Sequence, residues 1–403
     1  MKKKIISYCL VIALFLAGFM GVDQFKPQER TISIVNARAE PTPKETGLKV
    51  KAKAAVLMDA ASGRILFAQN AHKRLPPASV TKVMTMLLVL EACEKGKIDL
   101  KDTVTISERA ASMGGSQMYM EPGEQHTVEE LLMGVAMVSA NDGCVALAEY
   151  LAGSMEVFVE RMNKRAAELD MKDTNFVNTN GLPVANHYTS AYDIAVMSRE
   201  LIRFPETKNW LTKWQGTIKV GLPGKEKEFG LTNTNRLIKQ YAGAIGIKTG
   251  FTQDAGYCLS GAAERNGTRL IGVVLGCSSS QVRFRQISNL FDYGFSRYES
   301  VTAAKKGQVQ KWIYLEKAVP SKTALVLDTD VLVLAEKGKK KNITTKVEVD
   351  GHIKLPIKKG SKLGELVVYQ DGVEEARFPL KAADSAKKAS VTDLYIRMMK
   401  KIL

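Results

Sequence analysis

The chain carries the stretch Pro77-Ala78-Ser79-Val80-Thr81-Lys82 (residues 77–82), which opens a long apolar run. Proline cannot lie inside a helix, and the apolar residues from Val83 to Leu90 follow helical spacing, so a helix is predicted to begin close to Ser79. Residues three apart share one helix face, which brings the Ser79 hydroxyl and the Lys82 amine into the same space. A neutral lysine can take the proton of a serine and make it a nucleophile. An N-cap serine before an ordinary helix is the alternative interpretation of this stretch alone.

Two further motifs follow it in the chain. Ser139-Ala140-Asn141 ends an apolar helix predicted to start at Thr127, and Lys248-Thr249-Gly250 lies in a strand-like stretch. Together the three motifs resemble those of the penicillin-interacting serine enzymes, the penicillin-binding proteins and serine β-lactamases. The chain is most similar to the low-molecular-weight penicillin-binding proteins that are serine D-alanyl-D-alanine carboxypeptidases. The resemblance runs from about Ala54 to Tyr298 and continues more weakly to the C-terminus.

The resemblance implies a role for each motif residue. Ser79 becomes the acyl-ester, Lys82 is its base, and Ser139 relays a proton to the leaving amine. The substrate-binding residues that it implies are Asn141, Lys248, Thr249, Gly250 and Phe251. It implies neither a cofactor nor a metal ion.

Within that set the resemblance implies a more detailed division of work. Asn141 holds the substrate amide, and Lys248 attracts the terminal carboxylate and helps to keep Lys82 neutral. The backbone N–H groups of Ser79 and Phe251 form the oxyanion hole. Gly250 leaves room for an extended peptide on the strand edge. Which residue of Asn233-Thr234-Asn235-Arg236 adds a further polar group for the carboxylate stays open.

The N-terminus predicts export. Lys2-Lys3-Lys4 precedes an apolar run from Ile5 to Met20, and Ala37-Arg38-Ala39 supplies a small-x-small cleavage site, so residues 1–39 are predicted to be a signal peptide. An uncleaved anchor is the alternative, because the apolar run lies far from Ala39. We expect an extracytoplasmic location, in the cell wall or at the outer face of the cytoplasmic membrane.

Composition is consistent with this location. The 403 residues are 45% apolar, enough to bury the cores of two domains. The net charge of +16 suits an anionic wall or membrane, and no nucleic-acid-binding motif is present, so we expect no nucleic acid partner. The cysteines lack metal-site spacing. A hairpin turn at Asn266-Gly267 would make Cys258 and Cys277 diagonal neighbours, and we expect free thiols.

The expected fold class is an α/β (α+β) serine β-lactamase/transpeptidase-like domain over residues 40–299. A hairpin over 54–67 and the strands after Ile245 form its antiparallel sheet, with helices on both faces and a closing helix over 288–298. Short alternating runs then predict a small all-β domain over residues 300–383, which we interpret as a spacer.

Residues 384–403 predict an amphipathic basic tail. Apolar side chains recur there at helical spacing, with Arg397, Lys400 and Lys401 between them. The tail resembles the membrane anchor of the carboxypeptidases, and it is expected to lie on an anionic membrane surface. A short helix packed on its own protein, or a frayed end, is the alternative.

The sequence therefore predicts a D,D-carboxypeptidase that removes the terminal D-alanine from peptidoglycan stem peptides and is acylated and inhibited by β-lactams. A β-lactamase is one alternative, although neither Glu124 nor Glu129 lies in a segment like the deacylation loop. A non-catalytic penicillin-binding sensor or wall-binding protein is another. His187 and Asp193 could form a catalytic pair, but we interpret them as residues that pin a loop.

Overall fold

The computed structural model describes residues 46–339 and 342–402. The predicted signal peptide, residues 1–39, and its alternative as an anchor lie outside the described residues. Among the described residues, no helix combines the length and apolar character needed to cross a membrane.

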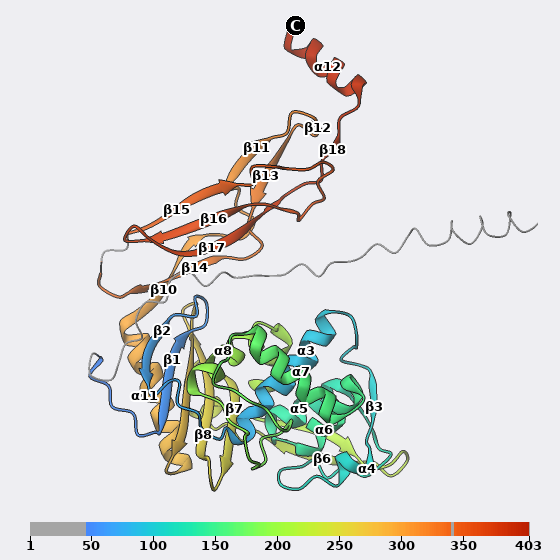
Figure 1. Ribbon diagram of the computed structural model, residues 1–403, viewed down its shortest axis with the longest axis vertical. Helices are drawn as coiled ribbons and strands as arrows, with labels where there is room; N and C mark the ends of the chain where they lie inside the picture. Colours follow the sequence, from blue (N-terminus) through green and yellow to red (C-terminus); the bar gives the residue numbers. More distant parts are fainter. Residues whose placement is uncertain (1–45, 340–341, 403) are drawn as a thin grey trace, which may run out of the picture. The chain divides into compact units, whose positions relative to one another are not determined.

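The first large element is a five-stranded antiparallel sheet (Figure 1). Its order is β2-β1-β9-β8-β7, so the N-terminal hairpin lies beside the strands that come much later in the chain, as predicted. The strands are β1 Ala54–Asp59, β2 Ile65–Gln69, β7 Ala244–Thr252, β8 Gly256–Arg265 and β9 Thr268–Cys277. Strand β7 carries Lys248, Thr249 and Gly250 and forms one edge of this sheet.

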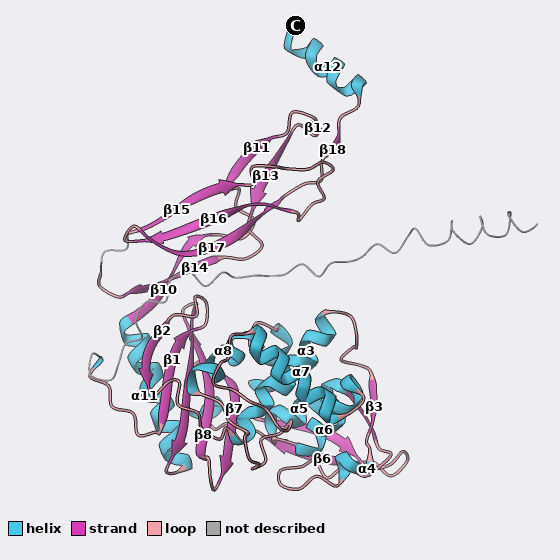
Figure 2. Cartoon of the chain, viewed as in Figure 1, coloured by secondary structure: helices cyan, strands magenta, loops and turns pink. Residues whose placement is uncertain are grey.

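Helices cover both faces of the sheet (Figure 2), which confirms the predicted fold class. On one face, α11 (Ser280–Arg297) packs Ile287 and Phe291 against buried residues of β1, β8 and β9. The other face meets a larger core built from the remaining long helices. These are α3 Lys82–Glu94, α5 Val128–Met137, α6 Asn141–Ala152, α7 Met155–Glu168 and α8 Ala191–Leu201.

Local capping signals in the sequence are realised in these helices. Thr127 and Glu130 form a capping box at the start of α5, close to the predicted start of this helix, and Gly96 and Gly153 adopt positive φ after α3 and α6. Shorter elements complete this part of the chain. They are β3 Thr103–Thr105, α4 Glu108–Ala111, β4 Gln125–Thr127, α9 Lys208–Leu211, β5 Gln215–Val220, β6 Lys227–Thr232 and α10 Leu237–Gln240.

The predicted start of the closing helix was wrong by about two turns. Helix α11 begins at Ser280, where the Ser279 hydroxyl accepts a hydrogen bond from the Val282 N–H at 3.2 Å. Arg283 and Gln286 interrupt the apolar pattern in the sequence, yet both are buried in the structure. Hydrophobic periodicity cannot reveal a helical turn whose buried side chains are polar.

The register predicted for Cys258 and Cys277 was also wrong. Pairing from the Asn266-Gly267 turn follows the prediction as far as Leu259, and then a bulge places Cys277 opposite Tyr257. Gly276 has a φ of +68° beside this bulge, a conformation that glycine adopts without strain. The expectation of free thiols is confirmed for both cysteines.

The C-terminal part is a β domain with its own apolar core, as predicted. Its main sheet has the order β11-β13-β17-β16-β15, and β10 pairs with β14. Residues 353–357 alternate as a strand would but do not form one: among them only Ile357 makes a bridge, to Ala386, and Pro356 has no N–H to donate. The strands are β10 Tyr298–Ala304, β11 Lys311–Tyr314, β12 Ala318–Val319, β13 Lys322–Val326, β14 Val331–Glu336, β15 Ile343–Val349, β16 Lys362–Gln370, β17 Val373–Ala382 and β18 Lys387–Lys388.

Candidate active site

Ser79 lies in a 3₁₀ turn, Ala78–Thr81, that leads directly into α3. Two glycines allow the chain to close around this turn. A Cβ on Gly250 would come within 2.9 Å of the Pro77 carbonyl oxygen and 3.1 Å of the Ser79 nitrogen, and one on Gly181 within 1.8 Å of the Ala78 oxygen. Gly250 therefore lets β7 approach the serine, a reason beyond the room for substrate that the sequence suggested.

Lys82 is fully buried and its amine is held by three oxygen atoms. It lies 3.1 Å from Ser79 Oγ, 2.7 Å from Asn141 Oδ1 and 2.7 Å from the Asn180 carbonyl oxygen. Burial lowers the pKa of Lys82 to about 8, against the opposing influence of Asp142. A substantial neutral fraction is therefore present near pH 8.

The same three contacts orient the neutral amine. The Asn141 and Asn180 oxygens can only accept, so they take two N–H donors of Lys82. The remaining direction faces Ser79 Oγ, and in the neutral amine it holds the lone pair. The geometry is that of a base aimed at the serine proton.

Lys248 is the second buried cation. Its amine donates to the Thr249 carbonyl oxygen at 3.2 Å. Burial, and then the charge of Lys82, lower the pKa of Lys248 well below its ordinary value. The charge of Lys82 thus acts on Lys248, whereas the lowered pKa of Lys82 comes from its own burial, and the expectation that Lys248 keeps Lys82 neutral stays a prediction.

The Ser139-Ala140-Asn141 motif contributes two further polar side chains to the site. Ser139 has a φ of +66°, and its buried hydroxyl has no hydrogen-bond partner among the described residues. Asn141 begins α6, and its Nδ2 donates to the Gly114 carbonyl oxygen at 2.6 Å. Asn141 thus ties Lys82 to the loop over 112–123 and keeps one Nδ2 hydrogen for another acceptor.

Thr249 points toward the segment that the sequence left open. Its hydroxyl lies 2.8 Å from the hydroxyl of Thr234, so Thr234 is the residue of Asn233–Arg236 that contacts the Lys248-Thr249-Gly250 motif. Behind β7, Arg283 donates to the carbonyl oxygens of Gly250 and Cys258. Phe251 is half exposed and packs its ring 4.4 Å from that of Tyr257.

His187 and Asp193 bond to other groups, as the loop-pinning interpretation expected. The Val177 N–H donates to His187 Nδ1, so the neutral ring carries its proton on Nε2, 2.8 Å from Thr81 Oγ1. Burial lowers the pKa of His187 to about 4. Asp193 accepts from the Asp173 N–H and the Thr174 hydroxyl.

The sequence assigned no role to three residues of this site. Thr234 lies in the stretch that the sequence left open, and its contact with Thr249 joins distant segments, whereas Asn180 acts through its backbone carbonyl. Arg283 gave no signal, because it belongs to the part of α11 that the periodicity missed. Over residues 46–339 and 342–402, no group of three or more His, Cys, Asp or Glu residues forms a metal site.

A serine at the start of a helix, next to a buried lysine whose pKa is lowered, defines a serine acyl-transfer enzyme. Residues 37–279 match the D-alanyl-D-alanine carboxypeptidase family model, Peptidase S11, and residues 298–388 match the penicillin-binding protein 5 C-terminal domain. The chain belongs to the D-alanyl-D-alanine carboxypeptidase family.

Relatives and solved structures agree with this assignment. The chain is 42% identical over 351 residues to the D-alanyl-D-alanine carboxypeptidase DacF of Bacillus subtilis, covering 87% of this chain and 89% of the relative. It is 34% identical to DacC of Escherichia coli, covering 82% and 83%. The crystal structure of penicillin binding protein 5 from Haemophilus influenzae superposes with a TM-score of 0.66 at 32% identity, covering 85% and 99%.

Proposed function

We propose that this protein is a serine D,D-carboxypeptidase that removes the terminal D-alanine from peptidoglycan stem peptides. The observation that carries the proposal is the position of the Lys82 amine, which lies 3.1 Å from Ser79 Oγ while two fixed acceptors hold its other donors. Membership of the carboxypeptidase family supports the choice of substrate.

The chemistry divides into two steps. Ser79 Oγ attacks the carbonyl carbon between the last two residues of the peptide as its proton passes to Lys82. The N–H groups of Ser79 and Phe251 stabilise the oxyanion, the C–N bond breaks, and the Ser139 hydroxyl relays a proton to the departing D-alanine. Water then hydrolyses the ester and returns the proton to Ser79. A β-lactam enters the same first step, but its amine stays tethered to the acyl group, so the enzyme remains blocked.

The substrate carboxylate is expected beside Lys248 and Thr249, in the middle of β7. Lys248 supplies an amine there, whose protonated form a bound carboxylate would favour, and the paired hydroxyls of Thr249 and Thr234 supply donors. One Nδ2 hydrogen of Asn141 bonds the Gly114 carbonyl oxygen, which leaves the second to donate to the carbonyl oxygen of the substrate amide. These roles follow the contacts of each side chain and remain proposals.

Two glutamates that a β-lactamase could use are engaged elsewhere, which favours the carboxypeptidase. Glu124 is buried against His126 at 2.9 Å, and Glu129 accepts a hydrogen bond from Trp210 Nε1. The deciding experiment incubates purified protein with a pentapeptide ending in D-Ala-D-Ala and, separately, with ampicillin. Release of D-alanine with little loss of ampicillin is expected. Rapid ampicillin loss without D-alanine release would make the protein a β-lactamase, and stable acylation with neither reaction would make it a sensor.

We also propose export through residues 1–39 and attachment of the C-terminal tail to an anionic membrane surface. Helix α12, Val391–Ile402, exposes Val391, Tyr395 and Met398, which supports insertion of an apolar face into the interface. The sequence assigned Arg397 to the headgroups, but its guanidinium donates to the carbonyl oxygens of Glu316 and Ala318. That contact ties α12 to the β domain and leaves fewer basic groups for lipid.

A truncation tests the tail. The protein without residues 389–403 should keep full penicillin acylation but should no longer sediment with anionic vesicles at low salt, because the apolar face and its charges are gone. Equal sedimentation of the truncated and intact proteins would show that the basic body or the β domain binds the vesicles instead.

A further inference from the structure

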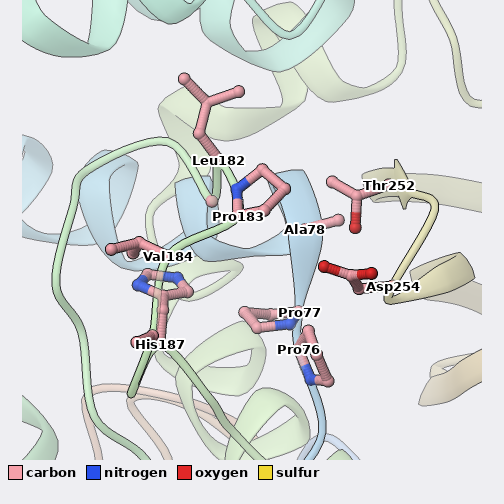
Figure 3. A pocket seen from close by; sticks show the side chains of 11 residues that line it. Pro76, Pro77, Ala78, Leu182, Pro183, Val184, His187, Thr252 and Asp254 are labelled. Carbon is pink, nitrogen blue, oxygen red and sulfur yellow. The ribbon is translucent and has the colours of Figure 1, made fainter.

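The cavity of about 350 Å³ in Figure 3 belongs to the active site already described. Residues 76–78 line it, and they immediately precede Ser79 in the chain. A surface that the acyl-transfer chemistry does not use lies on strand β11 of the β domain. It exposes two large aromatic side chains, Trp312 and Tyr314.

These two aromatic side chains lie on one face of a sheet edge. Among the described residues, β11 has β13 as its single neighbour in the main sheet of the β domain. Trp312 and Tyr314 are two residues apart and share a face, whereas Ile313 between them is buried in the core. Trp312 is 51% exposed and Tyr314 is 79% exposed. Two large aromatic rings exposed together on a sheet edge indicate an interaction surface.

Lysines surround this aromatic pair. Lys322 lies opposite Tyr314 on β13, and its amine lies 5.0 Å from the centre of the Trp312 ring. The stretch 305–322 has five lysines, and Glu316 is its single acidic residue. We call Trp312, Tyr314 and Lys322 the Trp312 surface. It combines amphipathic aromatic rings with positive charge, a composition typical of segments that lie at a membrane interface.

The end of β11 is also tied to the C-terminal helix. Arg397 of α12 donates to the carbonyl oxygens of Glu316 and Ala318, at 2.8 and 2.6 Å. Both acceptors lie within four residues of Tyr314 along the chain. Strand β18, which precedes α12, pairs with β12, which follows β11. The helix that is proposed to attach to the membrane is therefore held beside the strand that carries the exposed aromatic rings.

We propose that the Trp312 surface contacts the same anionic lipid surface as α12 and forms a second membrane contact of this protein. The rings of Trp312 and Tyr314 lie at the level of the headgroups, and Lys322 pairs with a lipid phosphate. Two linked contacts bind more tightly than one, because the first raises the effective concentration of the second. This inference rests on the proposed attachment of the tail, and it gives the β domain a binding role beyond that of a spacer.

Quenching of tryptophan fluorescence tests the contact directly. The probe is a phosphatidylglycerol vesicle that contains lipids brominated near the headgroup end of their acyl chains, which quench a tryptophan only at short range. The bound wild-type protein should lose part of its emission, and Trp312→Phe should abolish this loss. Trp214→Phe is the matched control and should leave the loss unchanged, although Lys239 lies 4.7 Å from the centre of the Trp214 ring in a similar pair. No quenching of bound wild-type protein would overturn the proposal.

A pair of lysine variants tests the charge. Lys322→Gln should weaken binding to phosphatidylglycerol vesicles about fivefold, the size expected for one basic residue near the surface. Added salt should shrink this difference, because screening weakens the attraction. Lys239→Gln removes the equivalent lysine beside Trp214 and should bind as the wild type does. Equal binding of Lys322→Gln and the wild type would contradict the proposal.

A glycan strand is the other partner on which exposed aromatic rings can stack. Trp312→Ala should therefore be compared with the wild type for sedimentation with purified peptidoglycan as well as with vesicles. The proposal predicts weaker binding to vesicles and unchanged binding to peptidoglycan. Loss of peptidoglycan binding with unchanged vesicle binding would make this a glycan-binding surface and the proposal wrong.

The protein without residues 389–403 separates this proposal from the attachment of the tail. If the intact protein binds vesicles through the tail but Trp312 is not quenched, the tail proposal stands and the Trp312 surface is wrong. If the truncated protein binds as well as the intact one and Trp312 is quenched in both, the tail proposal fails and the Trp312 surface stands. If neither protein binds, both proposals fail.

Discussion

The active site and the surface of the β domain place positively charged side chains in opposite environments. Lys82 and Lys248 are fully buried, have no carboxylate within salt-bridge distance among the described residues, and have lowered pKa values. Arg377 lies on β17 at the surface and contacts Glu348, Glu365 and Glu374, which raise its pKa. Burial without a neighbouring carboxylate lowers the pKa of a lysine toward neutral pH, so the amine can act as a base. At the surface, the neighbouring carboxylates keep Arg377 charged, and it cannot act as an acid or a base.

Replacing a lysine with arginine in each of the two regions gives the largest expected difference, measured as the rate of β-lactam acylation. Lys82→Arg should lower the rate of β-lactam acylation by about 10²–10⁴, because a guanidinium stays protonated and cannot act as a base. Lys346→Arg, at an exposed lysine paired with Glu348, should leave acylation unchanged. Stopped-flow labelling with a fluorescent penicillin measures both. Near-normal acylation by Lys82→Arg would reduce Lys82 to a structural role.

Ser139→Ala should separate activity from stability. Loss of the proton relay should lower D-alanine release by roughly 10², the lower end of the range for general acid catalysis. The melting temperature should not fall, because the buried Ser139 hydroxyl has no hydrogen-bond partner among the described residues to lose. D-alanine release and thermal unfolding are measured on one preparation. A large drop in melting temperature with full activity would assign Ser139 to the fold alone.

Arg377→Ala should produce the reverse result on a smaller scale. Removal of the guanidinium leaves Glu348, Glu365 and Glu374 facing one another without a cation, so the β domain should unfold at a slightly lower temperature. Added salt should reduce the difference by screening the carboxylates. D-alanine release should match the wild type. Loss of activity at temperatures where the variant is folded would contradict the contrast between the two regions.

The sequence predicted the fold well where the motifs and the hydrophobic periodicity correspond to the side chains that are buried in the structure. The three motifs, the capping box at Thr127 and the sheet with helices on both faces all appear in the structure. It failed where a buried turn is polar, as at Arg283, and where one bulge shifts a strand, as at Cys277. Contacts between distant segments could not be predicted at all, because Thr234 meets Thr249 and Asn180 meets Lys82 only after the chain folds.

The pH dependence of acylation tests the activation of Ser79 by neutral Lys82 most directly. Below about pH 8 the ammonium form predominates and the base is lost, so the rate constant for penicillin acylation should fall about tenfold per pH unit. Above this value it should level, and the apparent pKa belongs to the coupled pair of Lys82 and Lys248. The account predicts a profile with its midpoint near 8. A rate that keeps rising toward 10.5, the ordinary lysine value, or that does not change with pH, would contradict it.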